Sequence, residues 1–387
     1  AELDDLRRKI MQQEIEEMAL KKEDDQLSRD RLEELKKELA DEKEQFNAMI
    51  DEFLAAGFTY FDTAHGYLDG KSELALRDCL VARYPRESFV LADKLSSGFF
   101  KTRDDVLPFF EEQLRCTGAG YFDYYLLHAM SAERYEHYKG CGAFEIIPQL
   151  KREGKVRHFG MSFHDKAEVL DRILGLHPEL EFVQLQFNYL DYEDPVAESR
   201  KCYEVCVKHG KKVSVMEPVK GGSLAELPED AGAILDALGG GSHASYALRF
   251  AEGFENVFMV LSGMSTIGQM RDNLASMSDF RPLDERELAA VMQVAETLRG
   301  KGAIPCTECR YCTPGCPKGI DIPSYFECYN AKRMFDKPQS VKQYANLAEK
   351  GAGPADCIGC GQCEEACPQH LEIRRLLQSV AAEFKEG

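Results

Sequence analysis

Between about residues 47 and 300, short β-rich runs alternate with longer helical patterns, and this alternation constrains the fold more than any other feature. Helical patterns such as Asp165–Leu174, Glu198–His209 and Asp284–Leu298 separate the runs. A helix between successive strands makes the strands parallel, so the pattern predicts an α/β barrel or an open parallel sheet. A closed barrel needs eight strands, one more than the predicted strands Phe58–Asp62, Phe89–Lys94, Phe122–His128, His158–Ser162, Phe182–Asn188, Lys212–Pro218 and Asn256–Gly263.

The first three predicted strands end in, or lead into, polar residues. Asp62 ends the first strand and Tyr67 follows it, while Lys94 and His128 end the next two. Because C-terminal strand ends face the active site of a (β/α) barrel, these side chains should converge. Tyr67 could give a proton to a carbonyl oxygen as hydride reaches the carbon, and His128 could orient that carbonyl. A buried Lys94, paired with Asp62, would favour the ionised phenol.

Taken singly, each of these residues has an ordinary interpretation. A lysine at a strand end is more often a solvated surface group, and a lone histidine is more often a satisfied core residue. The four residues together predict a reductase site.

The residues around this site resemble the aldo/keto reductase superfamily. The stretch from Phe53 to Tyr67, with Tyr60-Phe61-Asp62-Thr63-Ala64 at its centre, closely matches the first motif of that superfamily. Gly154–Ser162, Gln184–Tyr189 and Met216–Pro218 supply further matches. The resemblance covers residues 47–300. It implies a (β/α)8 TIM barrel that interconverts carbonyls and alcohols with NAD(P)H, acting on a small carbonyl or alcohol substrate.

The resemblance also implies a set of cofactor contacts. Ser162, Gln186 and Asn188 would contact the carboxamide side of a nicotinamide, and Gly221 and Gly222 would lie along the pyrophosphate. The last predicted strand leads into a helix, whose backbone N–H groups and dipole favour phosphate. The family contacts in that region are Ser262, Gly263, Ser265, Gln269 and Asn273.

Selection of the 2′-phosphate of NADP has no evident basis near that helix. Many NADP-specific relatives carry Arg or Lys just after the last strand, where this chain has Ser265 and Thr266. Arg271 is the nearby cation. The choice between NADH and NADPH therefore stays open.

Residues 1–46 differ in kind from the rest of the chain, because 26 of them are charged. Leucine and isoleucine recur at three- and four-residue spacing, which predicts two helices that form a hairpin or coiled-coil arm. The sequences at 6–11, 19–25 and 31–35 resemble the start of the middle, coiled-coil domain of ClpB-type disaggregase chaperones. A generic charged helix is the alternative interpretation.

This arm stands where aldo/keto reductases carry other elements. Family members begin with a hairpin that caps the barrel bottom, followed by a glycine-rich first strand. Here residues 45–49 match the first barrel helix, and only the charged segment precedes them. We therefore expect a TIM barrel that lacks strand 1. A natural fusion, an engineered chimera and an artefact of gene assembly each account for this.

Near the C-terminus a cysteine pattern occurs twice. Cys-x-x-Cys-x-x-Cys-x-x-x-Cys-Pro begins at Cys306 and again at Cys357. This rhythm is typical of [4Fe–4S] ligands, and tetrahedral zinc is the weaker alternative. The other six cysteines have no ligand spacing and are expected to be ordinary thiols. The predicted metal ligands are Cys306, Cys309, Cys312, Cys316, Cys357, Cys360, Cys363 and Cys367.

Residues 304–380 resemble the helical dicluster ferredoxin modules of respiratory and reductase subunits. The matching stretches are Cys316–Pro323 and Ala355–Cys363. In such modules the fourth cysteine of each motif binds the other cluster. The resemblance therefore assigns Cys367 to the cluster of the first motif and Cys316 to the cluster of the second. The expected domains are an arm at 1–46, a barrel at 47–300 and a dicluster domain at 301–387.

The charge balance restricts the partners. With 67 acidic and 48 basic residues the formal net charge is −19, which argues against nucleic acid or an anionic membrane as a main partner. Cysteines that bind metal rather than form disulfides indicate a reducing compartment, so we expect a cytoplasmic protein.

The two expected cofactors differ in electron count. Nicotinamides pass two electrons as hydride and clusters pass one, yet the chain has no flavin fingerprint. A partner flavoprotein or ferredoxin could link them. Alternatively the clusters are structural or sensory, or the barrel cofactor is not a nicotinamide. Besides the enzyme, a non-enzymatic iron–sulfur electron-transfer or docking protein with a vestigial barrel, or a chaperone-linked interaction protein, would fit this chain.

Overall fold

The computed structural model describes residues 43–306, 310, 312–335, 338–367 and 370–385. These residues form two compact units, and each is described by itself. The first unit comprises 43–187, 199–218 and 251–282, and the second comprises 188–198, 219–250 and the described residues from 283 onward.

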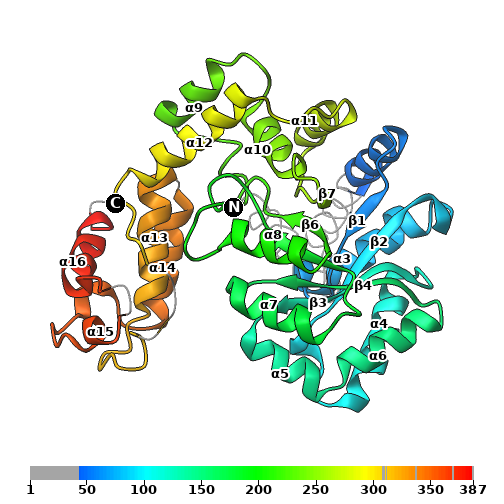
Figure 1. The fold of residues 1–387 in the computed structure, drawn as a ribbon, viewed down its shortest axis with the longest axis horizontal. Helices are drawn as coiled ribbons and strands as arrows, with labels where there is room; N and C mark the ends of the chain where they lie inside the picture. The colour runs from blue at the N-terminus through cyan, green and yellow to red at the C-terminus, as the bar shows by residue number, and fades with distance from the viewer. Residues whose placement is uncertain (1–42, 307–309, 311, 336–337, 368–369, 386–387) are drawn as a thin grey trace, which may run out of the picture. The chain divides into compact units, whose positions relative to one another are not determined.

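The first unit is built on a seven-stranded parallel sheet in which every strand pairs with the next strand along the chain (Figure 1). The predicted strands are confirmed, with ends that differ by a few residues. β3 extends two residues beyond the prediction and carries a register shift between Leu127 and Met130. The strands are β1 (Tyr60–Asp62), β2 (Val90–Leu95), β3 (Phe122–Met130), β4 (Val156–Phe163), β5 (Phe182–Gln186), β6 (Lys212–Met216) and β7 (Val257–Val260).

Aromatic side chains on the inner side of the sheet link its two edge strands. The ring of Tyr124 on β3 lies 5.3 Å from the ring of Tyr60 on β1. It also stacks on Phe258 of β7, at a centroid distance of 5.5 Å. Both edge residues pack on the same buried cluster, which contains Phe182. The sheet is therefore curled into most of a barrel. Among the described residues no strand pairs β1 with β7.

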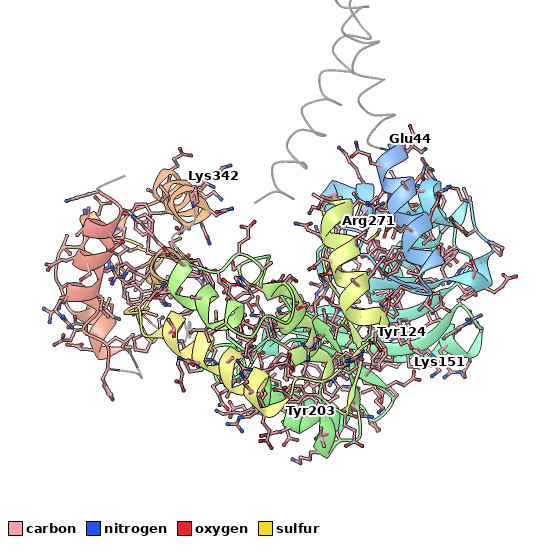
Figure 2. All side chains as sticks on the ribbon, turned by 90° about the horizontal axis from the view of Figure 1, so that it is seen from above. Glu44, Tyr124, Lys151, Tyr203, Arg271 and Lys342 are labelled. Atoms are coloured by element: carbon pink, nitrogen blue, oxygen red, sulfur yellow. The ribbon has the colours of Figure 1, made fainter. Side chains whose placement is uncertain are left out.

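Helices cover the sheet and connect its strands. Residues 43–55 are helical and lead into β1. Beside them, the guanidinium of Arg271 donates two hydrogen bonds, of 2.7 and 2.9 Å, to Glu52. Figure 2 shows Arg271 on α11 and Glu44 on the helix before β1. The other helices of this unit are α3 (Lys71–Leu76), α4 (Arg103–Thr117), α5 (Ala132–Gly140), α6 (Ala143–Arg152), α7 (Ala167–Leu176), α8 (Ser199–Lys208) and α11 (Ile267–Ser278), with short turns η1 (Tyr67–Gly70), η2 (Arg77–Val81), η3 (Arg86–Ser88) and η4 (Ser97–Phe99).

The second unit is helical. Its C-terminal core contains Ile322, Tyr325 and Phe326 of α13, and Leu377 and Val380 of α16. The helices that lie wholly or mainly in this unit are α9 (Glu229–Asp236), α10 (His243–Glu252), α12 (Glu285–Arg299), α13 (Ile322–Phe335), α14 (Pro338–Lys350), η5 (Pro354–Asp356), α15 (Gln362–Glu365) and α16 (Ile373–Glu383).

The compact units divide the chain differently from the domains expected from sequence. Residues 283–300, expected in the barrel, group with the cluster-binding segment, because α12 packs on α9 and α13. The helix at 43–55 also runs through the expected division between 46 and 47. The rest of the predicted N-terminal arm, including its ClpB-like stretches, lies outside the described residues. In the part of the chain that is described, no helix has the length and apolarity needed to cross a membrane.

Candidate active site and cluster-binding cavity

Lys94 is the buried charge at the centre of the predicted site. It is the next-to-last residue of β2, and its side chain is 1% exposed. The ammonium group donates to the carboxylate of Asp62 and, at 2.8 Å, to the carbonyl of Thr63. Burial lowers the pKa of Lys94, but Asp62, Tyr67 and Asp93 more than offset this, so the pKa lies above its ordinary value. Lys94 is therefore a cation, held at the end of β1.

Tyr67 and His128 complete the group of four residues. The Lys94 ammonium lies 4.8 Å from the centre of the Tyr67 ring. The rings of Tyr67 and His128 meet edge to face at 5.7 Å. Tyr67 is 40% exposed, whereas Lys94 beside it is buried. The structure thus brings together all four residues that the strand ends predicted.

A backbone irregularity fixes the position of His128. The next residue, Ala129, has a φ of +54°, which a residue with a side chain adopts at a cost. Its N–H donates to Ser162 Oγ at 2.7 Å, and its carbonyl accepts from Arg134 at 2.8 Å. The Tyr138 hydroxyl donates to the carbonyl of His128 at 2.8 Å. The strained turn is therefore held by side chains from two elements, β4 and α5.

His128 is an uncharged imidazole at neutral pH. Burial, together with the positive charges of Lys94 and Arg134 and nearby His164, lowers the pKa of His128 to about 3. Its Nδ1 makes a hydrogen bond of 2.6 Å with the Ser96 hydroxyl. Since a neutral imidazole has one donor and one acceptor nitrogen, Ser96 influences which nitrogen carries the proton.

The residues that the family resemblance assigned to the cofactor fall in both units. Ser162, next to the last residue of β4, and Gln186, the last residue of β5, belong to the first unit. Asn188, Gly221 and Gly222 belong to the second. Asn188 organises a turn, because its Oδ1 accepts from the N–H of Asp191 and its Nδ2 donates to the Asp191 carboxylate. Gly221 and Gly222 have φ values of +58° and +85°, which glycine adopts readily.

The segment after β7 forms the N-terminus of α11, as expected. The Gln269 side chain accepts from the N–H groups of Ser265 and Thr266, at 2.8 and 3.2 Å. Asn273 Nδ2 donates to Ser262 Oγ at 3.0 Å, and Gly263 is exposed. Because Gln269 already accepts from these two N–H groups, it is the positive end of the helix dipole that suits a phosphate group here. Arg271, the cation nearest in sequence, is committed to Glu52.

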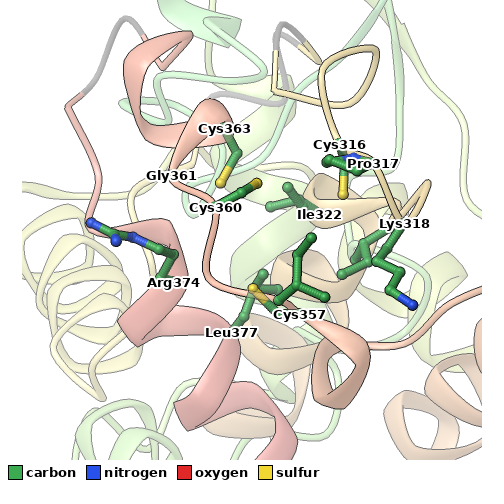
Figure 3. A pocket seen from close by; sticks show the side chains of 12 residues that line it. Cys316, Pro317, Lys318, Ile322, Cys357, Cys360, Gly361, Cys363, Arg374 and Leu377 are labelled. Atoms are coloured by element: carbon green, nitrogen blue, oxygen red, sulfur yellow. The ribbon is translucent and has the colours of Figure 1, made fainter.

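In the second unit, one cysteine of the first motif lies with three of the second. Cys316 lines a cavity together with Cys357, Cys360 and Cys363, and Figure 3 shows the four side chains around the same space. Arg374 braces the loop on one side of the cavity by donating to the Glu364 carboxylate at 2.7 Å. Four thiols around one hollow suit a [4Fe–4S] cluster.

The ligands expected for the other cluster are only partly described. Cys312 and Cys367 are buried in one apolar core, and Cys306 packs against it. Cys309 lies outside the described residues. The six cysteines without ligand spacing are all buried.

Comparison with known protein families assigns both parts of the chain. The family model described as "Aldo/keto reductase family" matches residues 34–296. The chain belongs to the aldo/keto reductase family. A model of the 4Fe-4S dicluster domain matches residues 305–371 of this family member.

Individual relatives are distant. The chain is 22% identical over 286 residues to an uncharacterized oxidoreductase, YqkF, of Bacillus subtilis, covering 65% of this chain and 88% of that one. A crystal structure of an aldo-keto reductase from Klebsiella pneumoniae in complex with NADPH has 20% identity and a TM-score of 0.55, over 66% of this chain and 86% of that one. An aldo-keto reductase from Bacillus halodurans, in its holo form, has 22% identity and a TM-score of 0.54, over 64% and 86%. These likenesses show the barrel-like fold.

The residues that surround the group of Asp62, Tyr67, Lys94 and His128 were not predicted from the sequence. Ser96 lies two residues after Lys94, so its position just beyond a predicted strand end could have identified it as a site residue. The strained backbone at Ala129 could not be predicted from the sequence, because alanine is not a residue that favours a positive φ. Glu73 and Gln113, buried behind Lys94, lie in helices and were not distinguishable from ordinary helix positions.

Proposed function

We propose that this chain is a nicotinamide-dependent oxidoreductase that interconverts a small carbonyl compound and its alcohol. The observation that carries the proposal is the convergence of Asp62, Tyr67, Lys94 and His128 at the ends of β1, β2 and β3. A bound nicotinamide would supply or accept the hydride. The fold relative from Klebsiella pneumoniae was solved with NADPH, and the positive end of the α11 dipole suits a phosphate of such a cofactor.

Each of the four residues would have its own role in proton transfer to the carbonyl oxygen. The Tyr67 hydroxyl would donate the proton to the carbonyl oxygen, because it is the exposed acid of the group. Lys94 would stabilise the phenolate that remains, as a buried cation 4.8 Å from the ring. Asp62 would hold Lys94 in place. With Ser96 donating to Nδ1, the neutral His128 would carry its proton on Nε2 and could donate it to the same carbonyl oxygen.

The C-terminal cysteines would hold two [4Fe–4S] clusters with crossed fourth ligands. The cavity that joins Cys316 to the cysteines of the second motif supports this assignment. A redox partner protein, such as a flavoprotein or another ferredoxin, would reconcile one-electron clusters with two-electron hydride chemistry. We propose a cytoplasmic setting, in which the thiols stay reduced.

A second candidate is an iron–sulfur electron-transfer or docking protein with a vestigial barrel. It is favoured by the outer edges of β1 and β7, which pair with no strand in the described part of the chain, since an open sheet weakens the placement of a cofactor.

Anaerobic cofactor titration distinguishes the two candidates. NADPH and NADH are titrated into the full chain with its clusters intact, and binding is followed optically. Oxidation of each nicotinamide is then measured with a panel of small aldehydes and ketones, and electron paramagnetic resonance shows whether the clusters become reduced. Saturable binding and substrate-dependent oxidation would support the enzyme. Absence of binding, with clusters that a chemical reductant reduces, would favour the electron-transfer protein.

The matched variant for this assay is Tyr67→Phe, which removes only the hydroxyl. Loss of a general acid commonly lowers the rate by 10²-fold or more. We therefore expect Tyr67→Phe to lower carbonyl reduction by about 10²-fold or more, with cofactor binding unchanged. Equal rates of carbonyl reduction in the two proteins would show that Tyr67 is not the proton donor, and would contradict this mechanism.

A further inference from the structure

A second cluster of buried titratable groups lies in the first unit, next to the four catalytic residues but separate from them. His65, Glu73 and Cys116 each place one metal-binding atom within 4.8 Å of the other two. They come from three elements: His65 from the loop after β1, Glu73 from α3 and Cys116 from α4. The Nδ1 of His65 and a carboxylate oxygen of Glu73 are 2.9 Å apart.

Glu73 is an unusual residue to find inside a barrel wall. Its side chain is 0% exposed, and it neighbours Asp93, which is also fully buried. The Gln113 amide donates to both, at 3.3 and 3.0 Å. Within the described residues no lysine or arginine side chain donates a hydrogen bond to either carboxyl group, because the Lys94 ammonium pairs with Asp62, and Asp93 accepts only from the backbone N–H of Lys94 and from Gln113. Burying a carboxylate without a cation is costly, so the pair requires a shared proton or a cation.

A further carboxylate, which accepts two hydrogen bonds from Arg115 and would have to turn from it to bind an ion, stands one helical turn before Cys116. Glu112 lies on the same face of α4, and one of its carboxylate oxygens is 3.5 Å from the Cys116 sulfur. It is partly exposed, so an ion could enter on this side. On the other side, the rings of Phe99 and Phe109 meet the His65 ring edge to face, at 4.8 and 5.1 Å, and fix its plane.

We propose that His65, Glu73, Cys116 and Glu112 bind one zinc ion in the wall of the barrel. One imidazole, one thiolate and two carboxylates form a closed tetrahedral donor set for zinc. Binding forms the zinc–sulfur bond and releases the thiol proton to solvent. The ion would offset the buried carboxylates and tie α3 and α4 to the loop that carries Tyr67. Its role would be structural, and it would be chemically distinct from the iron of the C-terminal clusters.

Metal analysis of the full chain with its clusters intact tests this proposal. The protein is purified anaerobically, incubated with zinc sulfate, and freed of loose metal by gel filtration. Zinc and iron are then counted per chain. We expect about one zinc in the wild type and less than one tenth of that in Cys116→Ala, with iron unchanged. The matched control is Cys141→Ala, which removes another buried thiol from the same unit and should keep the zinc.

X-ray absorption at the zinc edge separates this site from zinc in the cluster cysteines. The proposed site gives one sulfur at about 2.3 Å and three nitrogen or oxygen neighbours at about 2.0–2.2 Å. Zinc held by the cluster motifs would instead give four sulfur neighbours, and that spectrum would overturn the proposal. So would a wild type without zinc, or a Cys116→Ala variant that keeps it. Because the spectrum is recorded on the wild type, a variant that fails to fold does not leave the question open.

Discussion

Burial determines what Lys94 and His128 can do. Both are enclosed by the ends of β1–β4, yet one is kept charged and the other neutral. The difference is a carboxylate: Asp62 pairs with Lys94, whereas His128 faces a hydroxyl and positive charges. Two basic groups in one site therefore serve as a fixed cation and as a neutral donor.

The lowered pKa of His128 predicts how stability depends on pH. The unfolded chain protonates this histidine near pH 6.5, whereas the folded chain resists protonation until about pH 3. Below pH 6.5 the unfolded state therefore binds more protons. The unfolding free energy should fall as pH falls, by up to about 1.4 kcal/mol per pH unit for each such group.

Urea unfolding followed by circular dichroism between pH 7 and 5 measures this slope. His128→Asn should reduce it, since asparagine does not titrate there. His164, whose pKa is lowered by burial and by Arg134, should contribute in the same direction, so His164→Asn serves as a comparison. If neither substitution changed the dependence of the unfolding free energy on pH, the conclusion that folding keeps His128 neutral would be contradicted.

At the scale of elements, Gly160 controls the pairing of β4 with β5. A Cβ placed there would lie 2.5 Å from the Phe182 ring and 2.6 Å from the Phe182 carbonyl. Phe182 is 2% exposed and belongs to the inner cluster, so neither group can move away easily. Gly160→Ala should therefore destabilise the first unit, by about 1–3 kcal/mol, as overpacked cores do.

The matched control is Gly175→Ala in α7, where the nearest atom to a new Cβ is 3.9 Å away. This change should be neutral or slightly stabilising, because alanine favours the helix. Thermal unfolding of the two variants measures the difference. Equal midpoints would mean that the β4–β5 pair opens to accept the methyl group.

Among the described residues, the sheet ends at the edge strands β1 and β7. Tyr60 and Phe258, which pack on the inner cluster, remain partly exposed. We expect that replacing residues 1–44 with a family-type hairpin and first strand would cover them and would raise nicotinamide affinity. Calorimetric titration of the grafted and original chains measures this. Tight binding by the original chain would show that the gap is filled by other means.

The same graft in a Tyr67→Phe background separates binding from chemistry. Affinity should rise as before, while the rate of carbonyl reduction should not. A rise in rate without the hydroxyl would contradict the assigned role of Tyr67.

At the scale of the whole molecule, the proposed cluster ligands cross between the two cysteine motifs. Because Cys316 lines the cavity of the second motif, Cys316→Ser should damage the cluster of Cys357, Cys360 and Cys363. Cys367→Ser should instead damage the cluster of the first motif. Iron and sulfide analysis should find close to eight of each in the unaltered chain, because two full ligand sets are present.

Electron paramagnetic resonance of each reduced variant identifies the cluster that is lost. The two substitutions are matched, since each replaces the fourth cysteine of its motif. If each damages the cluster of its own motif, the ligation is not crossed.

The sequence predicted those features that repeat or that end a strand. The seven β-rich runs are β1–β7, and the polar residues at the ends of the first three lie together in the proposed catalytic group. It did not predict the grouping of α12 with the cluster-binding segment, because helix packing partners are set by complementary surfaces rather than by spacing. Nor did it predict Glu73 with Asp93, because charged residues are ordinarily exposed and only the fold brings these two inside.

The order of the strands has a consequence for how the protein is made. Each strand pairs only with its neighbours along the chain, so every pairing can form soon after its second strand has left the ribosome. Among the described strands, no pairing joins the first strand to the last. Each pairing therefore closes only a short loop of chain. The cysteine motifs are translated after β7. Iron–sulfur insertion would therefore come after assembly of the sheet, and a failure to insert clusters should leave the first unit folded.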